Sequence, residues 1–325
     1  MPRFEMFPNQ WTPILFSGEL GERPVQVTVA GEKLAIFRAD GAVHALQDRC
    51  PHRGAALSLG QVEGGCLRCP FHGWEFRGDG SCAHIPFNPD VPLDRARTLA
   101  LPTREIGGLI WVFTGEVAVG EPDVPAALLD PRFQTFQTSA TWRAHWTRAM
   151  ENMLDSPHLP FVHRYTIGMF IRPHMKRDSR MHLLTVSEPG GFLIESDIDG
   201  GRKSSALRWR TPNAMILDTI PSGRVQRMHV WCVPVDREHT RMMLISARDY
   251  GHYNPLVWLF DRVNRRILNE DRAVLESSDP PEVPDPREEV NVPSDGPTLR
   301  FRAWYLRNIA RRPGMGEAGD TREAG

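Results

Sequence analysis

Residues 50–76 read CPHRGAALSLGQVEGGCLRCPFHGWEF and contain two cysteine–histidine pairs with different spacings. One residue separates Cys50 from His52, whereas two residues separate Cys69 from His72. Tetrahedral zinc needs four ligands on one ion, and it usually takes them from C-x2-C or H-x3-H pairs, in which a tight turn presents both side chains to one point. A C-x-H pair fits that geometry poorly.

The two spacings are explained if each pair is divided between two metal ions. Cys50 and Cys69 then bind one iron and His52 and His72 bind the other, which is the ligand set of a Rieske [2Fe-2S] centre. The whole pattern, C-P-H followed after sixteen residues by C-P-F-H-G-W, closely resembles the Rieske fingerprint. The sequence therefore predicts an iron–sulfur cluster held by these four residues.

Zinc is the alternative for this stretch, because Cys66 forms a C-L-R-C pair with Cys69. The chain has five cysteines, an odd number, and four of them cluster between positions 50 and 82. In a chain of this size that pattern indicates metal binding rather than a secreted disulfide framework. We interpret Cys66 and Cys82 as small buried thiols without a ligand role.

The composition is that of a globular protein with a substantial core, since 41% of the 325 residues are hydrophobic. The 39 Lys and Arg nearly balance the 40 Asp and Glu, so no large field of one sign attracts nucleic acid or an anionic membrane. The N-terminus lacks the features of a signal peptide, and no apolar run is long enough to span a membrane. We expect a cytoplasmic protein that binds a small molecule or a protein partner.

Residues 151–163 form a second candidate metal motif, E-x3-D-x2-H-x4-H. On a straight helix Glu151, Asp155 and His158 share one stripe, whereas His163 lies to the side. Two prolines within the motif bend or end the helix, which would swing His163 toward His158. Two imidazoles and one carboxylate make the facial triad of non-haem Fe(II) oxygenases. The carboxylate is either Asp155 or a distant acid.

With the later motif E-D-x3-L-E at residues 270–276, the chain resembles the α-type oxygenase subunit of Rieske non-haem iron oxygenases. The branch it resembles includes chlorophyllide and pheophorbide oxygenases, aromatic O-demethylases and natural-product hydroxylases. The resemblance implies that Asp271 joins His158 and His163 at a mononuclear iron. Without it, Asp271 would be interpreted as an exposed helix carboxylate paired with an arginine. Asp155 would instead bridge a cluster histidine and an iron-ligand histidine across a subunit boundary in a head-to-tail homotrimer.

The resemblance also implies an α+β fold. An N-terminal antiparallel β Rieske domain would precede a helix-grip (START-like) catalytic domain, with a curved antiparallel sheet and a long C-terminal helix. Short alternating runs separated by turns before residue 115 agree with the first part. The predicted parts are the Rieske domain at 1–115, a connecting segment at 116–140, the mononuclear-iron catalytic domain at 141–312, and a flexible tail at 313–325.

The implied activity is the use of O2 to hydroxylate, demethylate or desaturate a C–H bond of an aromatic or natural-product substrate. Dioxygen activation needs two electrons and a Rieske centre stores one, so an external NAD(P)H reductase, with or without a ferredoxin, must supply them. No G-x-G-x-x-G follows a strand here, which places the nucleotide site on another chain. The alternative is a Rieske electron carrier or redox sensor whose C-terminal domain binds a ligand without oxygenating it.

Several residues of the second half are candidates for the substrate pocket, with ordinary core packing as the alternative for each. They are Trp209, Met215, Met228, His229, Trp231 and the segment 165–175.

Overall fold

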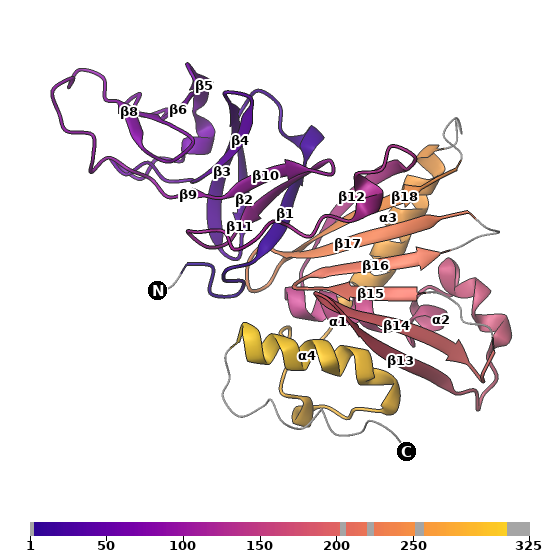
Figure 1. Ribbon diagram of the computed structural model, residues 1–325. Coiled ribbons are helices and arrows are strands. Elements are labelled where there is room, and N and C mark those ends of the chain that lie inside the picture. The colour runs from indigo at the N-terminus through magenta and orange to yellow at the C-terminus, as the bar shows by residue number, and fades with distance from the viewer. Residues whose placement is uncertain (1–2, 202–205, 220–223, 251–256, 311–325) are drawn as a thin grey trace. The chain divides into compact units, whose positions relative to one another are not determined.

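The chain forms two compact units, Met1–Leu129 and Asp130–Gly325 (Figure 1). The computed structural model describes residues 3–201, 206–219, 224–250 and 257–310. The predicted tail at 313–325 lies outside the described residues. Within the described part of the chain, no helix is both long and apolar enough to cross a membrane.

The first unit is built from three small antiparallel sheets, with strand orders β1-β11-β10, β2-β3-β4-β9 and β5-β6-β7-β8. The strands are β1 (Trp11–Phe16), β2 (Val25–Val29), β3 (Glu32–Ala39), β4 (Ala42–Gln47), β5 (Gln61–Glu63), β6 (Cys66–Arg68), β7 (Glu75–Phe76), β8 (Cys82–His84), β9 (Ala100–Leu101), β10 (Thr103–Ile106) and β11 (Leu109–Phe113). Single 3-10 turns occupy Ser17–Glu19, Leu57–Leu59 and Ala126–Leu128. The antiparallel β domain expected from the sequence is confirmed.

One hydrophobic core joins the β5-β6-β7-β8 sheet to β3 and β4. It contains Phe37, Leu57 and Phe76, which have no exposed surface. Cys50 and Cys69 belong to the same core. The two cysteines are therefore held by the packing of the sheets as well as by their own loops, which gives a metal site rigid support.

The second unit contains one seven-stranded antiparallel sheet with the order β12-β18-β17-β16-β15-β14-β13. Its strands are β12 (Gln134–Trp142), β13 (Met181–Glu188), β14 (Gly191–Ile198), β15 (Ala206–Arg210), β16 (Ala214–Thr219), β17 (Gln226–Pro234) and β18 (Thr240–Arg248). Its helices are α1 (Trp146–Leu154), α2 (Leu159–Val162), α3 (Val257–Leu275) and α4 (Gly296–Asn308). Single 3-10 turns occupy Ile167–Phe170, Arg172–His174, Pro286–Glu288 and Pro293–Asp295.

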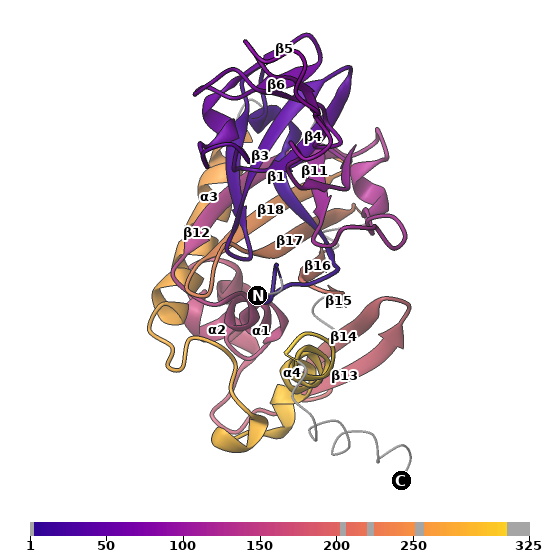
Figure 2. The same cartoon turned by 90° about the vertical axis from the view of Figure 1, so that its left-hand side faces the viewer.

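The helices of this unit gather on one face of the sheet. Trp209 of β15 makes edge-to-face contacts with Phe301 and Trp304 of α4, at centroid distances of 5.6 and 5.1 Å. Viewed from the side, α1 and α2 lie beside the long helix α3 (Figure 2). The large curved antiparallel sheet with a long helix near the C-terminus confirms the predicted α+β class.

Strand β12 begins inside the predicted connecting segment, residues 116–140. Residues 134–140 belong to β12, which pairs with β18 along its whole length from Gln134 to Trp142. The last proline before this strand is Pro131. Proline lacks the N–H that a strand donates, so β12 can pair without interruption because it contains no proline.

Candidate metal centres

The two cysteine–histidine pairs of the first unit lie on equivalent turns. The first turn follows β4, and the second joins β6 to β7. The Gly54 N–H donates to the Cys50 carbonyl at 2.8 Å, and the Gly73 N–H donates to the Cys69 carbonyl at 3.1 Å. Both glycines have a left-handed backbone, with φ of 75° and 72°, a conformation that strains other residues. The C-P-H and C-P-F-H sequences therefore end in the same kind of turn.

The thiols of these pairs lie inside the unit and the imidazoles lie near its surface. Cys50 and Cys69 are buried, whereas His52 is half-buried and His72 is exposed. The two imidazole centroids are 4.7 Å apart, and His52 stacks flat on Trp74 at 4.6 Å. A sulfur end inside and an imidazole end outside correspond to the two irons of a Rieske cluster.

Two backbone N–H groups beside the Cys50 thiol suit a bound cluster. Burial raises the pKa of the Cys50 thiol to about 11, although the backbone N–H groups of His52 and Arg53 lower it. These N–H groups would stabilise a thiolate that binds iron. Cys69 lies within hydrogen-bonding reach of the Cys50 thiol. Burial, and then the charge of His72, lowers the pKa of His52, whose buried Nδ1 atom has no hydrogen-bond partner among the described residues.

Cys66 has different surroundings from Cys69. All five cysteines are free and buried. Burial raises the pKa of the Cys66 thiol, and its charged neighbours are Glu75, Arg77 and Asp40. A tetrahedral zinc site needs both thiols of a C-x2-C pair on one ion, whereas the thiol within hydrogen-bonding reach of Cys69 is that of Cys50, which favours the cluster over zinc.

The helix that begins the second motif ends before the two histidines, as the prolines of the motif predict. Helix α1 ends one residue before Asp155, which caps it with an extended backbone (φ −87°, ψ 109°). Helix α2 is short, with His158 at its N-cap and His163 at its C-cap. One helical turn thus separates the two histidines, and their ring centroids lie 5.2 Å apart.

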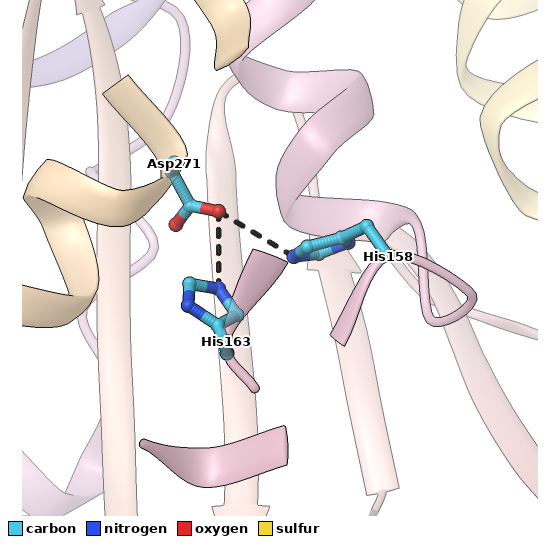
Figure 3. Close-up of side chains that lie close together, drawn as sticks. All are labelled: His158, His163 and Asp271. Atoms are coloured by element: carbon cyan, nitrogen blue, oxygen red, sulfur yellow. Dashed lines mark ion pairs between the residues drawn. The ribbon is translucent and has the colours of Figure 1, made fainter. Parts of the chain in front are cut away.

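Asp271 of α3 faces both histidines (Figure 3). Its Oδ1 atom lies 3.0 Å from Nε2 of His163 and 3.5 Å from Nε2 of His158. One ligand atom from each of the three residues lies within 4.8 Å of the others. Asp271 and His163 are 2% and 1% exposed, and Oδ1 of Asp271 is buried without a well-oriented hydrogen bond. Two imidazoles and an unsatisfied carboxylate oxygen that converge in this way fit a non-haem iron site.

His163 is held from its other side by Glu270. The Nδ1 atom of His163 lies 3.0 Å from Oε2 of Glu270, which also accepts a hydrogen bond from the Thr166 hydroxyl at 2.6 Å. Burial works against charging His163, but Asp271 and then Glu270 raise its pKa overall. Glu270 had no functional role in the sequence-based prediction. Its place directly before Asp271 is the one sequence signal that could have suggested it.

Asp155 and Glu151, which would share a stripe on a straight helix, have different partners. Oδ2 of Asp155 lies 3.5 Å from Nδ1 of His158, and the Asp155 side chain is 32% exposed. Glu151 instead accepts two hydrogen bonds from Arg302 of α4, at 2.7 and 3.0 Å. Burial raises the pKa of Glu151 in spite of this arginine. Glu151 therefore joins α1 to α4, and Asp155 remains near the candidate iron ligand.

The strand residues suggested for a substrate pocket divide between the two faces of the sheet. Trp209 pairs directly with Met215 across β15 and β16, and Trp209 packs on α4. Met215 pairs with Val230 of β17. Since side chains alternate along a strand, Met228 shares the face of Val230, whereas His229 and Trp231 lie on the opposite face. The helix-covered face therefore carries Trp209, Met215 and Met228.

Two family models match this chain. The Rieske [2Fe-2S] domain matches residues 10–97, and the vanillate O-demethylase oxygenase C-terminal domain matches residues 142–311. The fold and the sites define a two-domain iron oxygenase, and the chain belongs to the Rieske oxygenases. It is an oxidoreductase of a family that uses a [2Fe-2S] cluster, a mononuclear iron and electrons from an NAD(P)H reductase.

Individual relatives cover most of the chain. Dicamba O-demethylase, oxygenase component, of Stenotrophomonas maltophilia is 34% identical over 83% of this chain and 87% of the relative. Methylxanthine N1-demethylase NdmA of Pseudomonas putida is 27% identical over 90% of this chain and 87% of the relative. The solved structure of NdmA from Pseudomonas putida CBB5 superposes with a TM-score of 0.80 at 27% identity, and it covers 91% of this chain and 89% of that chain.

Proposed function

We propose that this chain is the terminal oxygenase of a system that removes a methyl group from oxygen or nitrogen of a small aromatic substrate. The observation that carries the proposal is the buried convergence of His158, His163 and Asp271, in a chain that also has a Rieske domain. Both relatives named above are demethylases, which favours demethylation over hydroxylation or desaturation as the outcome.

The proposed reaction balances with one O2 and two electrons. One oxygen atom enters a C–H bond of the methyl group, and the other leaves as water after it takes up two protons and two electrons. The resulting hydroxymethyl group then departs as formaldehyde, which leaves an O–H or N–H on the substrate. An NAD(P)H reductase on another chain supplies the electrons, either directly or through a ferredoxin.

The residues of each centre have separate tasks. Cys50 and Cys69 hold one iron of the cluster in the core of the first unit, and His52 and His72 hold the other near its surface. His158, His163 and Asp271 hold the mononuclear iron. When bound, this iron supplies open coordination positions at which O2 is activated. The protein binds the substrate beside the trio, excludes water and fixes the three ligands, since two of them have almost no exposed surface.

Asp155 is the proposed link for electron transfer between subunits. Its carboxylate is partly exposed and faces the ring nitrogen of His158 that points away from Asp271. His72 is exposed on the first unit. A head-to-tail homotrimer would place the exposed cluster histidine of one subunit against Asp155 of the next, where one carboxylate can hydrogen-bond to both imidazoles. We further propose a cytoplasmic location and a catalytic domain at residues 141–312.

A single-turnover experiment tests the proposed function without the natural reductase. The purified chain, with its cluster and ferrous iron reconstituted, is reduced chemically and mixed with O2 and a panel of methoxybenzoates and N-methylated heteroaromatics. We expect formaldehyde in amounts stoichiometric with the mononuclear iron for at least one substrate class. An Asp271→Ala variant that keeps its cluster should produce none.

The other outcomes separate the alternatives. A hydroxylated product that keeps its methyl group would overturn demethylation and retain the oxygenase. Reduced protein that passes electrons to an acceptor protein, yet oxidises no member of the panel and binds no mononuclear iron, would instead support an electron carrier.

A further inference from the structure

We propose that Glu270 is a positioning residue that fixes the His163 ring so that its Nε2 atom faces the metal. This inference rests on the proposed iron site. Glu270 and Asp271 are consecutive residues of α3, and His163 lies between their carboxylates. Its Nδ1 atom is 3.0 Å from Glu270, and its Nε2 atom is 3.0 Å from Asp271.

The hydrogen-bonding capacity of these groups determines the orientation of the ring. An ionised carboxylate can only accept a hydrogen bond, so Glu270 requires a hydrogen on Nδ1 of His163. In the neutral imidazole, Nε2 then carries the lone pair. That lone pair faces Oδ1 of Asp271, which is also an acceptor. Two acceptors 3.0 Å apart in a buried place are stable together when a cation lies between or beside them.

Glu270 is itself held from three directions. Its Oε2 atom receives the Thr166 hydroxyl at 2.6 Å in addition to His163, and its Oε1 atom receives Nε of Arg266 at 3.2 Å. Both carboxylate oxygens are therefore occupied, and the side chain is only 18% exposed. A carboxylate restrained in this way can restrain the ring bonded to it.

The same network connects the two elements that carry the ligands. Thr166 lies on the turn after α2, where its backbone N–H donates to the His163 carbonyl at 2.9 Å. Its hydroxyl reaches across to Glu270 on α3. Glu270 thus ties the end of α2, which supplies His163, to the helix that supplies Asp271. The separation of these two ligands depends on that tie.

The second histidine of the trio has no equivalent restraint. Nδ1 of His158 is buried without a hydrogen-bond partner in the described chain, and Asp155 is 3.5 Å away. The two histidines are therefore held unequally. His163 is fixed from within α3, and His158 faces the residue proposed to receive electrons from a neighbouring subunit.

Cobalt(II) binding measures this role without relying on activity. The mononuclear site of the full chain is emptied with a chelator while the Rieske absorption is monitored, and Co²⁺ is then titrated by its visible d–d bands. We expect Glu270→Ala to weaken Co²⁺ binding by about 10- to 100-fold and to alter the band pattern. Glu270→Gln has the same shape and keeps an acceptor for Nδ1, so it should recover part of the loss.

Arg272 offers a matched control on the same helix. Arg272→Gln removes an exposed pair with Glu276, whose Oε1 atom lies 2.7 Å from Nε of Arg272, and it should leave the Co²⁺ affinity within about twofold of wild type. If Glu270→Ala and Glu270→Gln both bind Co²⁺ like Arg272→Gln, with unchanged spectra, the positioning role is wrong. If wild type itself binds no Co²⁺, the proposed iron site fails and this inference fails with it.

Discussion

Replacing Arg302 with methionine is expected to destabilise the second unit by about 3 kcal/mol. The Arg302 side chain is 4% exposed. It donates two hydrogen bonds to Glu151, at 2.7 and 3.0 Å, and lies 2.9 Å from a carboxylate oxygen of Glu289. Among the residues that the structure describes, its loss leaves the buried Glu151 carboxylate with Arg148, at 3.2 Å, as the remaining cation. Breaking a buried pair usually costs about 3–5 kcal/mol, and the surviving arginine places this case at the lower end.

The effect depends on a buried carboxylate that loses its best-placed partner, so it can be separated from lost packing. In the double variant Glu151→Leu/Arg302→Met both buried charges are gone, and we expect a smaller loss than in Arg302→Met alone. Arg148→Met should cost about 1 kcal/mol, because that side chain is more exposed and Glu151 keeps Arg302.

Urea unfolding, monitored by far-UV circular dichroism, gives the free energies of unfolding of wild type and these variants. The reasoning is refuted if Arg302→Met lies within about 1 kcal/mol of wild type, or if the double variant loses as much stability as Arg302→Met alone. Because Glu151 holds α1 against α4, and Asp155 follows at the end of α1, Arg302→Met should also lower turnover.

Three further predictions concern the metals and pH. Asp271→Ala should lower iron from about three to about two atoms per chain while the Rieske absorption persists; equal loss of both signals would contradict separate sites. Asp155→Asn should retain all of the iron by metal analysis and nearly abolish turnover, and full activity would exclude the bridging role. Burial lowers the pKa of His229 to about 4 in the folded protein, whereas an unfolded histidine has a pKa near 6.5. Between pH 4 and pH 6.5, roughly, the unfolded state therefore binds more protons than the folded state. Stability should therefore fall as pH drops from about 6.5 to about 4, by up to about 3 kcal/mol from this residue. His229→Leu should reduce that pH dependence in thermal unfolding, and an unchanged slope would show that His229 does not cause it.

The proposed electron path joins two rigid metal sites through groups that are partly exposed. The cluster thiols are fixed in a core, and His163 is fixed by Glu270. His72 and Asp155 retain exposed surface. In the proposed trimer, His72 and Asp155 use this exposed surface for the contact with a neighbouring subunit, while the buried groups keep each metal site rigid.

The sequence by itself determined the cluster motif and the break before the iron-site histidines. Cys50 and His52 share one tight turn, as do Cys69 and His72, so the spacing predicts that each pair is divided between two metals. The prolines between Asp155 and His163 end a helix for local steric reasons. These features involve residues close in sequence, whose geometry depends on the backbone of a few neighbours.

Only the tertiary structure decided which acids meet the histidines. Asp271 and Glu270 lie more than a hundred residues after His163, and only the packing of α3 beside α2 brings them to opposite sides of its ring. From the residues alone, Asp271 is interpreted as an exposed helix carboxylate, and Glu151 shares one helical stripe with Asp155 and His158. Long-range packing decided both cases, because it buries Asp271 beside two imidazoles and gives Glu151 to Arg302.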